Sequence, residues 1–341
     1  MTRRRVFWPV LIVLVAAGSC RGGCRRADDR AATVEGRLAL FPVATKIVAA
    51  IDVAKLRASP AAAKLAAQAQ ENAADQREIE EFARRTGFDP LKQLNSVTVA
   101  FPEEARAHGE LGLVLRADHL DEARLVAYVR DQLQKKGDDL AASQHGRFTL
   151  WSSRRDPDLV GFFIDEQTFA LGGGGWGVRM ADLAETARPG DSAATNVDLV
   201  NLVERAAGTH ALWAAAIVPE STRKTLAADP RFADAASILT LSAGIDLAKG
   251  LDARLSADLA TVAEARALAA KVGEALRDGK RNPEVLMLGL GPYLDGISAR
   301  ATERAFELDA SLNEAALDDL LNRLGGLLAL ARSGAVPGFS R

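Results

Sequence analysis

Alternating apolar and polar side chains predict β-strands along much of this chain. Val160, Phe162 and Ile164 alternate with other residues ahead of a tight turn, as in one arm of a hairpin. Apolar runs at 46–53 and 210–218 have the length of buried strands. Further strands are predicted at 96–101, 110–116, 168–172, 237–246, 250–258, 297–301 and 304–310.

Apolar positions three or four residues apart predict helices between these strands. The clearest helix covers 261–279, where Thr261 and Glu264 have the spacing of a capping box. A helix near 122–133 is expected to be capped by Asp118. Further helical stretches are predicted at 59–85, 177–187 and 313–324, the last with a capping box at Ser311 and Glu314.

Two parts of the chain resemble each other in the same order. The strand at 95–101 precedes a similar one at 237–243 by 142 residues, and Glu122-Ala123-Arg124 recurs at the same offset as Glu264-Ala265-Arg266. Residues 166–183 align with 303–320 at an offset of 137. We interpret this similarity as an internal duplication.

The predicted fold class is therefore α+β, with two tandem similar halves, each a mainly antiparallel sheet with helices on one face. Neighbouring strands and hairpins, rather than alternating βα units, are the basis of this prediction. The expected organisation is a signal peptide at 1–19, a tether at 20–40, a first repeat at 41–190, a connector at 191–207, a second repeat at 208–326 and a tail at 327–341.

Composition and charge narrow the functional classes. Only 5% of residues are aromatic, so we expect a core of small aliphatic side chains and no sugar-stacking platform. Without residues 1–19 the chain holds 40 basic and 45 acidic side chains, a net charge of about −5. A broad nucleic-acid-binding surface is therefore not expected.

The glycine-rich stretch 171–177 contains a literal G-x-G-x-x-G at Gly172, Gly174 and Gly177. A dinucleotide-binding turn needs such glycines between the first strand and helix of a βαβ unit. Here the preceding strand is the second arm of a predicted hairpin, so we interpret the glycines as a strand-to-helix corner. Gly174, Gly175 and Trp176 are kept as a candidate contact surface on a mobile lip.

Other chemistry is sparse. The four histidines, His108, His119, His145 and His210, lie apart from one another and from cysteine, so no zinc spacing exists. Motifs for a serine nucleophile elbow, a metalloprotease or a calcium loop are absent from the sequence. We therefore predict no catalytic residues, no metal and no cofactor.

The first twenty residues have the organisation of an export signal. Arg3, Arg4 and Arg5 precede an uncharged apolar run at 6–18, which is too short to span a bilayer. Ala17-Gly18-Ser19-Cys20 then resembles the lipobox of a bacterial lipoprotein precursor, with Ala at position 17 where Leu is commonest. The alternative is an ordinary secretory signal with Cys20 as an incidental residue.

The resemblance implies cleavage before Cys20 and a lipid on its sulfur. Arg21 follows, whereas the retention signal of inner-membrane lipoproteins is Asp, so the resemblance favours the outer membrane facing the periplasm, with the cell surface as an alternative. Cys24 has no assigned role. The mature region loosely resembles uncharacterised bacterial lipoproteins with repeated α+β halves, a likeness that implies architecture and no activity.

Three functional hypotheses follow for a protein on the cell envelope. The first is a non-catalytic binding or scaffolding module with an envelope protein as partner. The second is a carrier of a lipid or other amphiphile in an apolar groove between sheet and helices. The third is an enzyme whose dispersed site shows no motif.

Overall fold

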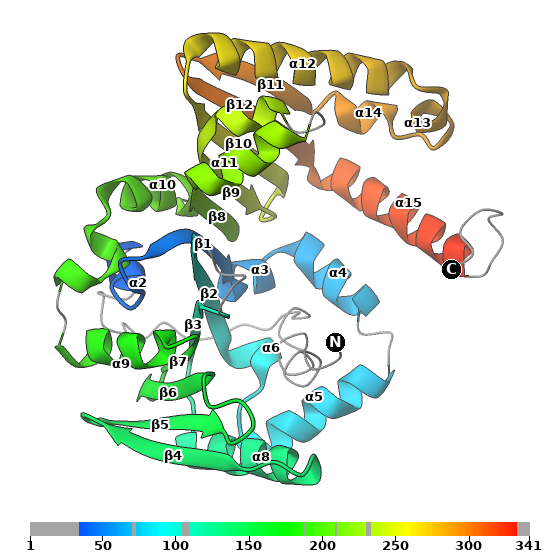
Figure 1. Ribbon diagram of the computed structural model, residues 1–341. Helices are drawn as coiled ribbons and strands as arrows, with labels where there is room; N and C mark the ends of the chain where they lie inside the picture. The colour runs from blue at the N-terminus through cyan, green and yellow to red at the C-terminus, as the bar shows by residue number, and fades with distance from the viewer. Residues whose placement is uncertain are drawn as a thin grey trace.

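The computed structural model describes residues 34–69, 73–103, 109–186, 189–208, 210–229 and 233–332. Within them the strands form one 12-stranded sheet in which every neighbouring pair is antiparallel. Helices pack on this sheet, so the predicted α+β class is confirmed. The spatial order is β11-β12-β10-β9-β8-β1-β2-β3-β7-β6-β5-β4 (Figure 1).

The strands have the following bounds. They are β1 Thr45–Asp52, β2 Leu94–Pro102, β3 Leu111–Ala117, β4 Leu140–His145, β5 Phe148–Ser153, β6 Val160–Asp165, β7 Thr168–Gly173, β8 Leu212–Ile217, β9 Ile238–Asp246, β10 Gly250–Leu259, β11 Ile297–Thr302 and β12 Ala305–Asn313.

The α-helices lie between and after these strands. They are α2 Val34–Leu38, α3 Val53–Arg57, α4 Pro60–Ala69, α5 Ala73–Thr86, α6 Pro90–Gln93, α8 Glu122–Lys135, α9 Trp176–Thr186, α10 Val197–Ala207, α11 Glu220–Ala228, α12 Val262–Arg281, α13 Pro283–Met287, α14 Gly291–Leu294 and α15 Glu314–Arg332.

The two halves of the sheet have the same strand order, counted outward from its centre. One half begins β1-β2-β3-β7-β6 and the other is β8-β9-β10-β12-β11, and β1 pairs with β8 where they meet. The first half then continues with β5 and β4 at its edge. Ala49 faces Ala214 at the middle of that pair. The order agrees with the sequence similarity, while common descent of the halves stays a prediction.

Helices cover both faces of the first half, so the prediction of helices on one face is wrong there. One core cluster joins α2, α9 and α10 to one face through residues such as Val48, Ala100 and Phe162. A second cluster joins α5 and α8 to the opposite face through Val97, Val99 and their neighbours. Both faces of these strands are apolar, which is why both bind helices.

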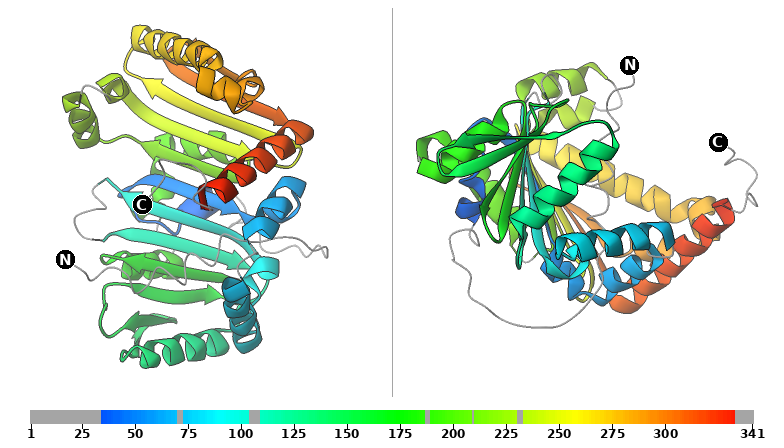
Figure 2. Two further views of the ribbon diagram at one scale, coloured as in Figure 1. Left: turned by 90° about the vertical axis from the view of Figure 1, so that its right-hand side faces the viewer. Right: turned by 90° about the horizontal axis from the view of Figure 1, so that it is seen from below.

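The second half has helix α12 on one face, while on the other face α10 packs on β8 and β9 and an ion-paired surface lies over the outer strands. Ala265 of α12 packs with Ala257 and Phe306 of the strands. On the opposite face Arg254 contacts Asp309 at 2.7 Å, and such polar residues allow that face to meet water. Helices α12, α13, α14 and α15 therefore lie on the same side of the sheet as α5 and α8 (Figures 1 and 2).

The predicted tether, connector and tail need correction. Leu38 of α2 is fully buried in the first core, so the folded body includes residues from the predicted tether. The predicted connector contains α10, an amphipathic helix whose Leu199 and Val203 are fully buried in the same core. Helix α15 continues to Arg332, inside the predicted tail.

Helix caps agree with the sequence at one of the three predicted positions. Thr261 Oγ1 accepts from the main-chain N–H of Glu264 at 3.2 Å, as the capping box requires. The first-half helix α8 is capped by Asp121 rather than Asp118. Helix α15 begins at Glu314 and has Asn313, the residue before it, as its capping acceptor, whereas Ser311 lies three residues before the helix start.

Candidate functional site

The glycine-rich corner is a tight turn between β7 and α9. Gly174 and Gly175 have φ values of 58° and 81°, which a residue with a side chain rarely adopts. A Cβ on Gly172 would lie 2.2 Å from the main-chain nitrogen of Gly177, so the strand and the helix start touch closely. Since β7 is antiparallel to both β3 and β6, the corner lies outside any βαβ unit.

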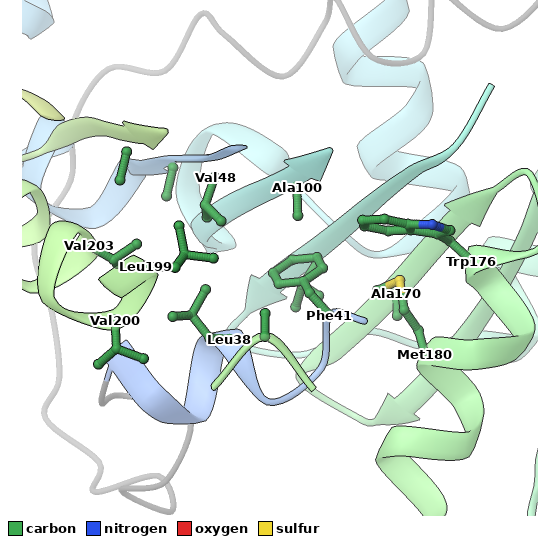
Figure 3. Packing of buried hydrophobic residues seen from close by; sticks show 14 of the residues in the cluster. Leu38, Phe41, Val48, Ala100, Ala170, Trp176, Met180, Leu199, Val200 and Val203 are labelled. Atoms are coloured by element: carbon green, nitrogen blue, oxygen red, sulfur yellow. The ribbon is translucent and has the colours of Figure 1, made fainter. Parts of the chain in front are cut away.

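Trp176 is a core residue, and its prediction as a contact residue is wrong. It is fully buried and belongs to the cluster that contains Phe41 and Met180 (Figure 3). Its indole N–H has no hydrogen-bond partner among the described residues. Of the candidate contact surface, Gly174 is half-buried and Gly175 is exposed, so only main-chain atoms meet solvent there.

The described histidines form local pairs. His145 Nε2 lies 2.7 Å from Asp182, His119 lies 3.8 Å from Glu166, and His210 Nδ1 lies 2.9 Å from the carbonyl of Ala206. Among the residues that the structure describes, no group of three or more His, Cys, Asp or Glu side chains could hold a metal ion. His108 and both cysteines lie outside the described residues.

The membrane-anchor prediction also falls on residues outside the described part, since Cys20 precedes residue 34. Within the described ranges, no helix combines the length and apolar character needed to cross a bilayer.

An apolar groove crosses the centre of the sheet where the two halves meet. Its volume is about 310 Å³, and it lies over β1, β2, β8 and β9. The residues that line it are Ala49, Ala50, Ile51, Val97, Val99, Leu212, Trp213, Ala214, Ala243, Gly244 and Ile245. None of these lining residues carries a charge, a hydroxyl or an amide side chain.

The alternation of side chains along the strands produces the apolar lining of this groove. Ala49, Ala214 and Ala243 are direct cross-strand neighbours, so one row of methyl groups runs over the floor. Ala50 and Trp213 alternate with them and pack in the core on the opposite face, so they reach the groove through their main chain. Small side chains in the row leave the depth that larger ones would fill.

Among the described residues, no helix residue lines the groove, which lies between two helix-covered clusters. The cluster under α5 and α8 includes Val97 and Val99 at its margin. The cluster under α12 begins at Leu241 and Leu255. Ile245, at the margin of the groove, is 36% exposed.

Helices α4 and α15 project from the same face of the sheet and flank this region (Figures 1 and 2). Lys64 of α4 forms an ion pair with Asp318 of α15. The next residue, Asp319, accepts hydrogen bonds from the Tyr293 hydroxyl of α14 and from Arg323. These two donors hold the pKa of the Asp319 carboxyl below its ordinary value.

A small polar pocket lies on the opposite face, beneath α2. It has a volume of about 20 Å³, room for about one water molecule. Ser96, Arg116 and Thr168 form one cross-strand row in its floor, and Arg37 of α2 covers it. Burial lowers the pKa of the Arg37 guanidinium.

Three consecutive apolar residues are exposed at a corner of the second half. Leu286, Met287 and Leu288, at the end of α13, are 57%, 82% and 41% exposed. Runs of exposed apolar residues are unusual on a soluble surface. The corner is on the same side of the sheet as the groove (Figure 2).

Comparisons with known proteins yield distant structural likenesses only. No protein family matches the chain, and no curated protein does. A solved structure, crystal form I of TP0453, is similar with a TM-score of 0.40 and 10% sequence identity, covering 85% of this chain and 96% of that chain. A likeness at this level identifies neither a relative nor an activity.

The apolar groove was expected only in general form. From the sequence, Ala-rich helices such as 261–279 either leave a groove against the sheet or pack tightly through small side chains, and tight packing is favoured. In the structure α12 packs on its own cluster, and the groove lies on the strands. The available signal was the pair of apolar runs at 46–53 and 210–218, which both centre on alanines. Their pairing in space decides that these alanines share one floor.

Proposed function

We propose that this chain is a lipid-anchored cell-envelope protein that acts by binding rather than by catalysis. Its anchor is the lipid on Cys20, and its favoured location is the outer membrane, facing the periplasm. The groove at the centre of the sheet is its binding surface. The signal-peptide pattern at residues 1–20 supports the location, and the groove supports the mode of action.

The single observation that carries the proposal is the chemistry of the groove wall. Catalysis requires a nucleophile, an acid or base, or a group that stabilises developing charge. The groove is lined by aliphatic side chains, glycine and a tryptophan, none of which supplies such a group. It offers apolar area to a partner, which is what a binding surface needs.

Site-specific photo-crosslinking tests the proposal in native membranes. A photo-reactive phenylalanine replaces Ile245 at the groove margin, and the control carries it at Val197, a 68% exposed residue of α10. We expect a reproducible adduct with one class of molecule from position 245 and none from position 197. Equal, non-specific labelling from the two positions would contradict a binding role for the groove.

A second candidate function is carriage of a lipid or other amphiphile. The aliphatic wall favours it over a protein scaffold, because protein interfaces also carry hydrogen-bonding groups. The test is mass spectrometry of solvent extracts from the chain beginning at residue 20, with Cys20→Ala to exclude the anchor's own lipid. A bound amphiphile at a fixed stoichiometry is expected, and an empty extract from freshly purified protein counts against carriage.

A further inference from the structure

The hydrogen-bonding capacity of the groove decides which kind of molecule fits it. Its floor is sheet, whose main-chain N–H and C=O groups are already paired between β2, β1, β8 and β9. The side chains add no donor or acceptor apart from the indole of Trp213, which packs in the opposite core. An extended peptide would therefore leave its own polar groups unsatisfied, which is costly.

The size of the groove suits a small ligand. It measures about 310 Å³, at the lower end of the roughly 300–1,000 Å³ typical of small-molecule sites. A slender apolar ligand matches this volume.

We propose that the groove holds a single hydrocarbon chain of a membrane amphiphile, with the polar head group outside. This inference rests on the proposed function, which makes the groove the binding surface. Val34, the first residue of α2, is fourteen positions after Cys20. Even fully extended, this stretch spans at most roughly 50 Å, so an anchor at Cys20 keeps the groove close to a bilayer that supplies such chains.

The charges near the groove do not select one head group. Lys55 lies 3.9 Å from Asp52 at the end of β1, and Lys64 pairs with Asp318 between the flanking helices. Each positive charge has a negative neighbour, so anionic and cationic head groups meet similar surroundings. The hydrocarbon chain of the ligand, rather than its head group, therefore determines affinity.

Ligands of increasing alkyl-chain length test the proposal directly. The mature chain from residue 20, with Cys20→Ala, is titrated with alkyl sulfates and alkyl trimethylammonium ions of increasing length, each below its micelle concentration. Displacement of a dansyl-labelled fatty acid reports binding. Each added methylene should tighten binding roughly fourfold until the groove is full, with the same slope for both head groups. Affinity that does not depend on chain length overturns the proposal.

Two groove variants and one matched control locate the site. Ala214→Phe fills the centre of the floor and should weaken long-chain binding at least tenfold. Val99→Thr adds a hydroxyl to the wall at almost constant volume and should weaken binding several-fold even if Ala214→Phe folds poorly. Ala142→Phe makes the same change at an exposed position of β4, outside the groove, and should leave binding unchanged. Thermal melts check that the variants are folded.

The remaining outcomes separate this inference from the proposed function. Equal loss of binding in Ala142→Phe and Ala214→Phe overturns the groove as the site. If light scattering shows a dimer that Val99→Thr dissociates, a second copy of the protein occupies the groove. That result also overturns the inference of a hydrocarbon chain. A protein adduct at position 245 in native membranes, without binding of alkyl chains, overturns the inference and leaves the proposed function standing. If neither a specific adduct at position 245 nor binding of alkyl chains is observed, both the inference and the proposed function are rejected.

Discussion

Lys64 of α4 and Asp318 of α15 form an ion pair although 254 residues separate them in the chain. Their neighbour Asp319 contacts Tyr293 of α14, in the second half. Two consecutive carboxylates therefore bind α15 to both halves of the molecule. These contacts hold α15 in its first third, and its start follows β12 directly.

Breaking the first of these contacts should loosen α15 without unfolding the protein. An exposed ion pair contributes at most about 1 kcal/mol, and the Lys64 side chain is 54% exposed. We expect Lys64→Glu to change the free energy of unfolding by less than about 1 kcal/mol while amide hydrogen exchange in α15 becomes faster. The double variant Lys64→Glu/Asp318→Lys should restore slow exchange. Unchanged exchange in the single variant would show that the pair does not hold the helix.

The second contact should depend on pH through Asp319. Hydrogen bonds from Tyr293, then Arg323, lower the pKa of this carboxyl from its ordinary value of 3.8. A lowered folded-state pKa means that the contact stabilises α15 above the ordinary value and is lost as pH falls through the lowered one. Tyr293→Phe should therefore raise the midpoint of the Asp319 carboxyl titration, measured by NMR. Arg281→Gln, a change outside the contact, should not move it, and equal midpoints in all three proteins would refute the assignment.

Gly172 in the glycine-rich corner should tolerate substitution less well than Gly190, which lies outside that corner. A Cβ at Gly172 would meet the main chain of Gly177 at 2.2 Å, whereas at Gly190 it would meet nothing within 4 Å. We expect Gly172→Ala to destabilise the protein by about 1–3 kcal/mol and Gly190→Ala to have little effect. Urea unfolding of the two variants measures the difference. Equal midpoints would mean that the corner adapts and that its glycines are not required for packing.

Lipidation should depend on Cys20 alone. Labelled palmitate should be incorporated by the unaltered precursor and by Cys24→Ala, and lost from Cys20→Ala. Because Asp after the modified cysteine is the inner-membrane signal of the lipoproteins that this signal resembles, Arg21→Asp should move the protein from the outer- to the inner-membrane fraction. Label retained by Cys20→Ala would contradict the anchor, whatever the fractionation shows.

The sequence predicted the fold class because strand alternation and helical periodicity are local signals, while the duplication of the halves stays a prediction. Whether helices cover one face or both was not predictable, since Val97 and Ala100 are equally apolar on opposite faces and only the fold shows what packs on each. The hairpin of β4 and β5 was missed because the first arm, residues 140–145, lacks apolar alternation and has no buried residue.

The candidate site depended still more on tertiary structure. Trp176, beside four glycines, could be an exposed contact or a core residue by sequence, and packing against Phe41 and Met180 decides for the core. The groove arises from strands that are far apart in the chain, β1 and β8, and no local pattern states which face of each remains uncovered. The alanines at its centre carry no chemistry that a motif search could detect.

The pairing of β1 with β8 also bears on the orientation of a ligand in the groove. Ala49 faces Ala214 and Ile51 faces Leu212 within the groove, whereas Ile47 faces Ala216 beyond it. A rotation that exchanges the two strands would place Ile51 on Ala216, so the two ends of this strand pair differ. The floor of the groove can therefore favour one orientation of a ligand.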